Sequence, residues 1–182
     1  MAADPYQPFT NPVTRETFRC LSSTSEAYTM EWSVEPGGYV PFEHIHVAQD
    51  EVCHILRGQI RAVIGGRQQI AQAGQTLTIP RGTAHIAYND THEPLVCIVE
   101  YKPGLDVFKS FQCFAGLTHD HDLGWFYGIN VPKMMYFMKK LDIQALVRPA
   151  FIPGTLFFLG LYGFLMLGSL LGWETQCRRY TQ

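Results

Sequence analysis

The chain has 182 residues and is nearly neutral, with 14 lysines and arginines against 16 aspartates and glutamates. This length suits one domain with an appendage, and the balanced charge, without a basic stripe, argues against a nucleic-acid partner. Five scattered cysteines without a C-x-x-C pair fit a reducing compartment better than a disulfide framework. The N-terminus also lacks the basic start and apolar run of a secretory signal.

Residues 1–24 are predicted to form an N-terminal arm, because the first part is rich in Pro, Asn and Thr. In the following "EAYTMEWSV", hydrophobic residues alternate with polar ones, which is the period of a half-buried strand. Short alternating runs recur to about residue 104, separated by turn signals such as "EPGG", "GGR" and "PRG". No helical pattern lies between them. Residues 25–104 are therefore predicted to form one mainly β, antiparallel sandwich or barrel.

The pattern changes after residue 104. Residues 105–130, with Gly, His and Asp between aromatic residues, are predicted to be a loop region. The segment "VPKMMYFMKKLDIQALVR", residues 131–148, fits an amphipathic helix that begins after Asn130. Residues 149–173 contain no charged side chain, and a short tail, residues 174–182, ends the chain.

Histidines and a glutamate with the spacing of metal ligands lie in "GGYVPFEHIHVAQDEVCHILRG", residues 37–58. His44 and His46 are one residue apart in a predicted strand, so both side chains point to the same face. Glu51 follows a tight connection and begins a strand that can pair back beside them. His85 lies on a later strand, after the "PRG" turn. Three imidazoles and one carboxylate suit Fe, Mn, Ni, Cu, Co or Zn.

The spacing of these residues resembles the two signature motifs of the cupin superfamily. The defining positions of the two motifs are Gly38, His44, His46, Glu51 and Gly58, and then Gly74, Pro80, Gly82, His85 and Asn89. The resemblance covers residues 38–89 directly and 25–102 by implication. It implies a small β-barrel of jelly-roll topology in which His44, His46, Glu51 and His85 bind one divalent transition metal ion.

Strand parity predicts which neighbours share the interior with the ligands. Side chains two or four residues from a ligand on the same strand face the same way, so the predicted substrate pocket contains Phe42, Cys53, Ile55 and Ala87. Cys53 is open to three interpretations: a soft extra ligand, an oxidisable thiol, or a small core residue. In "THDHD", residues 118–122, the alternatives are a second metal cluster and a solvated acidic turn.

The uncharged segment 149–173 is predicted to cross a membrane, since it exceeds the roughly 20 residues that a span needs. The excess of Lys and Arg before it favours a single-pass C-terminal anchor with the barrel facing the cytoplasm. The alternative is a helix packed on the barrel or across a dimer, in a cytoplasmic protein. If the segment is a separate anchor, a chain cut after Leu146 is expected to be a soluble, metal-loaded barrel.

The resemblance implies a fold and a metal more firmly than a reaction, because cupins have diverse activities. One hypothesis is a non-haem Fe, Mn or Ni dioxygenase acting on a small apolar or phenolic substrate near a membrane, with Glu51 as ligand and proton acceptor. The other is a membrane-anchored module that binds or senses a small molecule or the metal itself. Pairing of two copies through their sheets, as in other cupins, is a further expectation.

Overall fold

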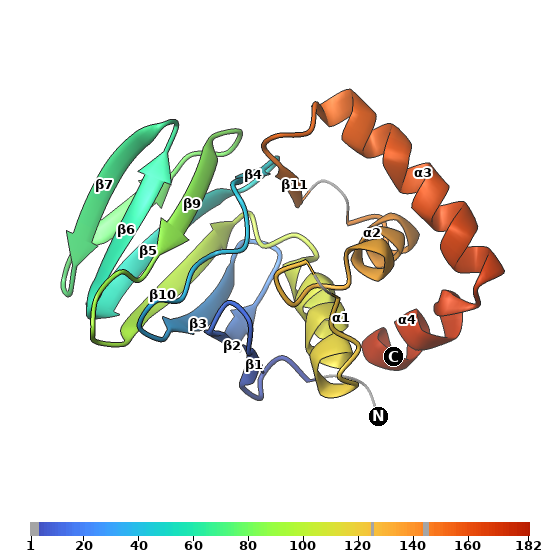
Figure 1. The fold of residues 1–182 in the computed structure, drawn as a ribbon, viewed down its shortest axis with the longest axis horizontal. Coiled ribbons are helices and arrows are strands. Elements are labelled where there is room, and N and C mark those ends of the chain that lie inside the picture. Colours follow the sequence, from blue (N-terminus) through green and yellow to red (C-terminus); the bar gives the residue numbers. More distant parts are fainter. Residues whose placement is uncertain (1–3, 125, 144–145) are drawn as a thin grey trace.

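A computed structural model describes residues 4–124, 126–143 and 146–182. Two antiparallel sheets lie on one side of the molecule and the helices on the other (Figure 1). The strands are β1 (Phe9–Asn11), β2 (Glu16–Ser23), β3 (Tyr28–Val34), β4 (His44–His46), β5 (Asp50–Arg57), β6 (Gln59–Ile64), β7 (Arg67–Gln72), β8 (Thr76–Ile79), β9 (Ala84–Tyr88), β10 (Leu95–Lys102) and β11 (Val147–Pro149). The helices are α1 (Val107–His119), α2 (Val131–Lys140), α3 (Gly154–Leu170) and α4 (Trp173–Thr181).

The strands form two separate sheets. Their orders are β1-β2-β3-β10-β5-β8 and β11-β4-β9-β6-β7, and every pairing is antiparallel. This arrangement confirms the mainly β, antiparallel prediction for the region that carries both motifs. A barrel closed by strand-to-strand hydrogen bonds was also expected, and the described residues do not form one.

The predicted N-terminal arm is wrong as a description of residues 9–23, because β1 and β2 extend the first sheet beyond β3. The alternating burial of β2 gives the reason. Glu16, Phe18 and Cys20 are buried on one face, whereas the residues between them are half-buried. The hydrophobic side chains of this face continue the interior of the sheet.

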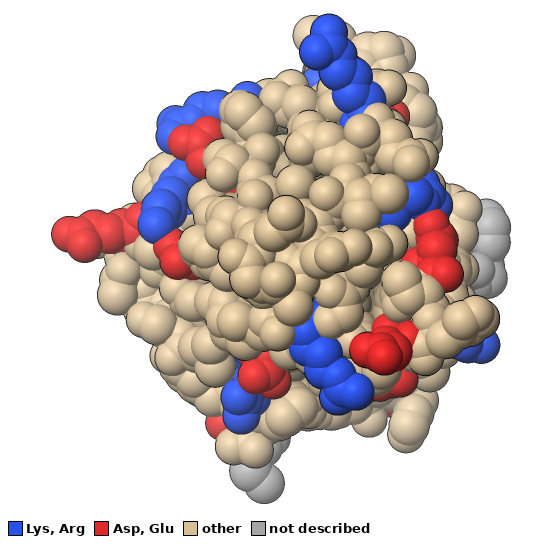
Figure 2. Space-filling view, turned by 90° about the vertical axis from the view of Figure 1, so that its left-hand side faces the viewer, with Lys and Arg blue, Asp and Glu red and all other residues tan. Residues whose placement is uncertain are grey.

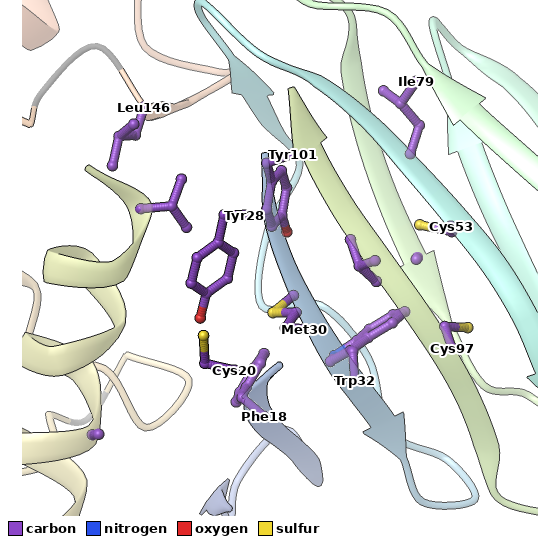
Figure 3. Close-up of a cluster of buried hydrophobic side chains, with 14 of the residues drawn as sticks. Phe18, Cys20, Tyr28, Met30, Trp32, Cys53, Ile79, Cys97, Tyr101 and Leu146 are labelled. Atoms are coloured by element: carbon purple, nitrogen blue, oxygen red, sulfur yellow. The ribbon is translucent and has the colours of Figure 1, made fainter. Parts of the chain in front are cut away.

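The core lies between the sheets and is built from side chains that share a face. On β3, Tyr28 and Trp32 lie opposite Tyr101 and Cys97 of β10, and Figure 3 shows these side chains beside one another. All four are less than 9% exposed. The alternation recognised in the sequence therefore produces a continuous apolar inner face.

The segment predicted as a loop, residues 105–130, contains α1. This helix covers the first sheet at β1 and β2, where Phe114 contacts Phe9 edge-on at 5.4 Å between ring centroids and Phe18 at 5.6 Å. Phe111 stacks on Tyr28 at 5.4 Å. Asp106, the residue before the helix, makes no capping hydrogen bond with its side chain. Aromatic packing, rather than a local start signal, therefore stabilises α1.

The predicted helix 131–148 is shorter than expected. The helix α2 ends at Lys140, and its N-cap is Asn130, whose side chain accepts a hydrogen bond from the Lys133 backbone N–H at 3.3 Å. After it, β11 pairs with β4, with Val147 opposite His46 and Pro149 opposite His44. The end of the predicted helix is thus a strand at the edge of the second sheet.

The uncharged segment forms α3, which runs along the outside of the helical side (Figure 1). Gly172, with φ of +73°, ends the helix in the left-handed conformation that glycine adopts without strain. Helix α4 follows at 99° to α3, packs on α1, and buries Cys177 and Tyr180. No described helix is by itself long and apolar enough to cross a membrane. The bent pair of α3 and α4 meets these criteria only jointly.

The predicted single-pass anchor over 149–173 is therefore not formed as one continuous helix. Phe157, Leu161 and Gly168 of α3 are buried against the rest of the protein, which agrees with part of the alternative interpretation. Most other large side chains of α3 are exposed.

Charged side chains are mixed on the face that Figure 2 shows, which is the side where β6 and β7 lie in Figure 1. Lys and Arg lie next to Asp and Glu around a broad uncharged centre. On β6, Arg61 pairs with Asp90. Positive and negative groups therefore neutralise one another around this face.

Candidate metal centre

Three strands bring the four predicted ligands together. His44 and His46 lie on β4, Glu51 on β5 and His85 on β9, and His44 is directly opposite His85 in the β4–β9 pairing. One donor atom from each residue lies within 4.8 Å of the others. All are buried except His44, which is partly exposed. The sequence spacing thus predicted a real cluster.

Backbone contacts orient two of the imidazoles. The Nδ1 atom of His44 is 3.2 Å from the Phe42 carbonyl oxygen, and Nδ1 of His85 is 3.1 Å from the Thr83 carbonyl oxygen. A carbonyl oxygen only accepts, so each Nδ1 carries the hydrogen and donates it. In the neutral ring, Nε2 then keeps a free lone pair, which is the arrangement a metal ligand needs.

The carboxylate of Glu51 lies at the centre of the cluster. Its Oε2 atom is 2.9 Å from Nε2 of His46 and 3.1 Å from Nε2 of His85, while its Oε1 accepts a hydrogen bond from the Cys53 thiol at 3.3 Å. Cys53 therefore orients Glu51, a role that strand parity alone did not reveal.

The donor set fits a transition metal ion. Two ligand atoms about 2.1 Å from one ion and at right angles are roughly 3 Å apart, close to both Glu51 contacts. In addition, Nε2 of His46 is buried without a hydrogen-bond partner, despite its short contact with Glu51. An unpaired buried acceptor is costly, and an ion shared with Glu51 would satisfy it.

The protonation states favour ligation at two positions. Burial, with the neighbouring His85 and His46, holds the pKa of His44 well below its usual value, so this ring is neutral. Burial alone would raise the pKa of Glu51, but the His46 and His85 imidazoles outweigh it and hold that pKa well below normal. For His85, Glu51 outweighs burial and raises the pKa, so an incoming ion competes with a proton there.

Turns next to the ligands fix their strands. Asp50, which precedes Glu51, accepts hydrogen bonds from the Arg81 backbone N–H at 2.8 Å and from the Arg81 guanidinium at 2.7 Å. Arg81 lowers the pKa of this carboxyl to about 2. The Gly82 N–H donates to the His46 carbonyl at 2.8 Å. At Gly58, φ is +76° and a Cβ would lie 2.6 Å from the Pro94 carbonyl oxygen, so only glycine fits.

A cavity of about 190 Å³ lies beside the cluster. His44, Glu51 and His85 line it, together with mostly apolar side chains from both sheets and from α1. Three of the four predicted pocket residues, Phe42, Cys53 and Ala87, are among the lining residues, but Ile55 is not. Although Ile55 has the predicted parity, it lies four residues beyond Glu51 along β5 and is buried in the core at 2% exposure.

Sequence reasoning missed two polar residues of this cavity, Glu16 and Tyr101. Glu16 lies in the segment interpreted as an arm, and only the alternation of β2 could have placed it inside. Tyr101 is opposite Glu51 in the β5–β10 pairing, and its ring centroid is 4.9 Å from that of His46. Its position depends on strand register, which the sequence did not specify.

Neither of the other histidine-containing sites joins the centre. His54 has the opposite parity to Glu51 on β5, and its side chain contacts Thr76 at 3.1 Å and Glu100 at 3.2 Å. In the "THDHD" segment, Asp120 accepts a hydrogen bond from the Tyr180 hydroxyl at 2.6 Å, and Asp122 pairs with Lys133. Among the described residues, the metal-ligand geometry occurs at the His44 cluster and not here. This acidic segment instead connects the helices.

Comparison with known proteins gives a family match over residues 30–101, to a family described as a cupin domain. No curated protein sequence matches the chain. Three solved structures illustrate the likeness. An uncharacterized conserved protein with a double-stranded β-helix domain from Klebsiella pneumoniae is 20% identical with a TM-score of 0.46, covering 54% of this chain and 79% of that one. KdgF from Halomonas sp. is 16% identical with a TM-score of 0.48, and the match covers 52% of this chain and 85% of that one. An RmlC-like cupin from Shewanella frigidimarina is 17% identical with a TM-score of 0.47, and the match covers 52% of this chain and 82% of that one.

The family match includes both motifs that were recognised in the sequence, from before Gly38 to beyond Asn89. It also contains all four residues of the His/Glu cluster. Residues 30–101 of the chain are therefore identified as a cupin domain.

Proposed function

We propose that the protein is a metal-dependent oxidoreductase of the dioxygenase type, acting on a small apolar or phenolic molecule. The observation that carries the proposal is the cavity of about 190 Å³, whose wall is apolar except near the His/Glu cluster and at a few isolated polar groups. An engineered apolar cavity of ~150 Å³ holds benzene. This cavity therefore suits one ring with short substituents, placed beside the cluster.

The residues of the chain have distinct roles in this proposal. His44, His46, Glu51 and His85 hold the ion, which when bound supplies Lewis-acid and redox chemistry. The ring of Phe42, whose centroid is 6.3 Å from that of His44 in an edge-on arrangement, forms part of the apolar wall next to the cluster. Glu51 is ionised and is the candidate acceptor for a phenolic proton, while Cys53 fixes its other oxygen.

The first experiment measures the metal content of full-length protein purified without chelators or an imidazole column. We expect about one Fe, Mn, Ni or Cu per chain, and oxygen uptake when 4-methylcatechol is added. His46→Ala should lower the metal content at least tenfold without unfolding the protein, since ligand loss removes one of four donors. His54→Ala, on the outer face of β5, is the matched control and should retain the metal. Full occupancy in His46→Ala would contradict the ligand assignment.

A second candidate function, a binding or sensing module, is favoured by the other titratable residues of the cavity. Among its described lining residues outside the cluster, these are Glu16, Cys53 and Tyr101. Burial raises the pKa of all three, that of Glu16 to about 8, so each holds its proton at neutral pH. None of these three groups can therefore act as a general base at neutral pH. Thermal stabilisation by 4-methylcatechol without oxygen uptake by metal-loaded protein would support this function over the enzyme.

We also propose that α3 rests on a lipid membrane, with the cupin domain on the cytoplasmic side as the Lys and Arg bias predicts. Helix α3 carries no charge, and its exposed large apolar residues are Leu156, Leu159, Tyr162, Met166, Leu167 and Leu170, from 43% to 84% exposed. An apolar surface of this kind usually marks an interaction site. At its border, Lys139 lies 4.6 Å from the Tyr162 ring centroid, a position suited to lipid phosphates.

Flotation with phosphatidylcholine vesicles containing phosphatidylserine tests this contact. The wild type should float with the vesicles. The double variant Leu159→Lys with Met166→Lys should bind the vesicles at least about tenfold more weakly, because each substitution removes exposed apolar surface. Leu56→Lys, at a residue 55% exposed on β5, controls for added charge. If the wild type stays with the aqueous phase and instead sediments as a dimer that the double variant abolishes, the surface binds a second copy.

A further inference from the structure

Glu16 places a carboxyl group in the same cavity as the metal-ligand cluster, on a different part of the sheet. It lies on β2, whereas Glu51 lies on β5, and β3 and β10 separate the two strands. Both side chains line the cavity, and Glu16 is 3% exposed. The cavity therefore has one polar group remote from the cluster, with apolar side chains such as Met30 and Val99 in the intervening wall.

The environment of Glu16 contains hydrogen-bonding groups and no counter-charge. Its Oε1 atom accepts a hydrogen bond from the Trp32 indole N–H at 3.2 Å. Thr14 lies close enough to affect the carboxyl, yet its buried hydroxyl makes no hydrogen bond of normal geometry. In the part of the chain that the structure describes, Glu16 forms no ion pair with Lys, Arg or His.

This environment makes Glu16 an unusual core residue. Burying an unpaired carboxylate is costly, and the carboxyl responds by keeping its proton, with a pKa raised by burial to about 8. At neutral pH it is then a neutral acid that can donate through O–H and accept at its carbonyl oxygen. A residue whose role is only to fill the core does not need to donate and accept hydrogen bonds. A hydrogen-bonding group at the wall of an apolar cavity does fix the orientation of a ligand.

We infer that Glu16 recognises a hydroxyl or carbonyl oxygen at the end of the ligand remote from the His44, His46, Glu51 and His85 cluster. The inference deepens the proposed function and rests on it, because it requires the cavity to hold a ligand. The class of ligand is an elongated molecule with an apolar middle and an oxygen function at each end. One end lies beside the cluster, and the other forms a hydrogen bond with the Glu16 carboxyl group.

A pair of catechol series tests the inference with full-length, metal-loaded protein under anaerobic conditions, so that no turnover occurs. One series carries ω-hydroxyalkyl chains of two to five carbons at ring position 4. The other carries alkyl chains in which a methyl group replaces the hydroxyl. Three strand spacings and an offset of six residues along the strands, from the level of Leu95 to that of Tyr101, separate Glu16 from Glu51, and the series finds the chain length that reaches Glu16. Dissociation constants are measured by calorimetry.

At one chain length, the wild type should bind the hydroxyl compound about five- to tenfold more tightly than its methyl counterpart, the effect of one hydrogen bond. Glu16→Ala should abolish this preference while still binding the alkyl compound. Glu31→Gln, on the opposite face of β3 and paired with Arg19, is the control and should keep the preference.

If alkylcatechols bind but no chain length shows a preference in the wild type, the inference about Glu16 is wrong and the proposed function stands. If no catechol of either series binds, the proposed function fails and the inference fails with it. If Glu16→Ala does not fold, the inference can still be tested on the wild type through the infrared carbonyl band of protonated Glu16. In the wild type, this band should shift on binding the hydroxyl compound and remain unchanged with its methyl counterpart. A band unchanged by both would overturn the inference.

Discussion

Glu16 gives the protein a stability that depends on pH in a way that a glutamine would not. Its pKa is about 8 in the folded chain and near 4.5 in the unfolded chain, so the folded state binds more protons between these values. The contribution of Glu16 to the free energy of unfolding is therefore fully present below about pH 4.5 and is lost as the pH rises through 8. The slope reaches ~1.4 kcal/mol per pH unit at most.

Glu16→Gln should remove this slope. When the free energy of unfolding of both proteins is measured by urea denaturation from pH 5 to pH 8 at equal metal content, the variant should gain stability relative to the wild type as the pH rises. Glu31→Gln, whose carboxyl is partly exposed and paired with Arg19, should follow the wild type. Parallel curves for Glu16→Gln and the wild type would show that the carboxyl is not perturbed.

At this scale the sequence predicted the four residues of the His/Glu cluster and little of the rest of the cavity. The two cupin motifs fix His44, His46, Glu51 and His85 because ligand spacing is local to each strand or turn. Cys53 was open to three interpretations, since its hydrogen bond to Glu51 depends on side-chain orientation. Glu16 reaches the cavity because β2 pairs with β3, and the alternation of β2 predicts a buried face without specifying that partner strand.

The strand β11 joins the C-terminal part of the chain to β4, the strand that contains His44 and His46. A chain cut after Leu146 loses β11, which pairs with β4, and also loses the buried side chains of Phe157, Leu161, Cys177 and Tyr180. The expectation of a soluble, metal-loaded barrel is therefore replaced by its opposite. We predict that this truncated protein aggregates or binds at least tenfold less metal.

The measurement is size-exclusion chromatography followed by elemental analysis, each compared with the full chain. A chain that lacks only Thr181 and Gln182 is the control and should remain monodisperse and loaded, because Gln182 is exposed and Thr181 only partly buried. A soluble product with full metal content after the cut at Leu146 would show that the two sheets fold and bind the ion without β11 and the last two helices.

Among the elements, the sequence predicted those with a clear period. Strands β3 to β10 follow from alternation and turn residues. Helix α1 was missed because "VFKSFQCFAGLTH" contains aromatic residues and a glycine, so its helical state depends on packing against Phe9 and Phe18. The length of the uncharged segment 149–173 suggested one helix that spans all of it, but α3 covers only Gly154–Leu170, between the end of β11 and the turn at Gly172.

At the scale of the whole molecule, metal binding should raise the stability of the fold, because the ligands come from three strands in different parts of the chain. An ion at 100 times its dissociation constant adds ~2.7 kcal/mol, which for a domain of this size raises the melting temperature by about 5–10 °C. We predict this shift for the chelator-treated wild type when Mn²⁺ or Ni²⁺ is returned. It should disappear in His85→Ala, and His54→Ala should keep it. Calorimetry measures the shift, and an equal shift in His85→Ala would place the ion elsewhere.

The short path from β4 to α3 has a consequence for the way the protein would distribute in a cell. Four residues separate Pro149, opposite His44, from the first residue of α3 at Gly154. If lipid contact at α3 changes the affinity for the ion, thermodynamic reciprocity requires the ion to change the affinity for lipid by the same factor. The loaded and empty forms would then partition differently between membrane and water, and the metal supply of the cell would set where the protein resides.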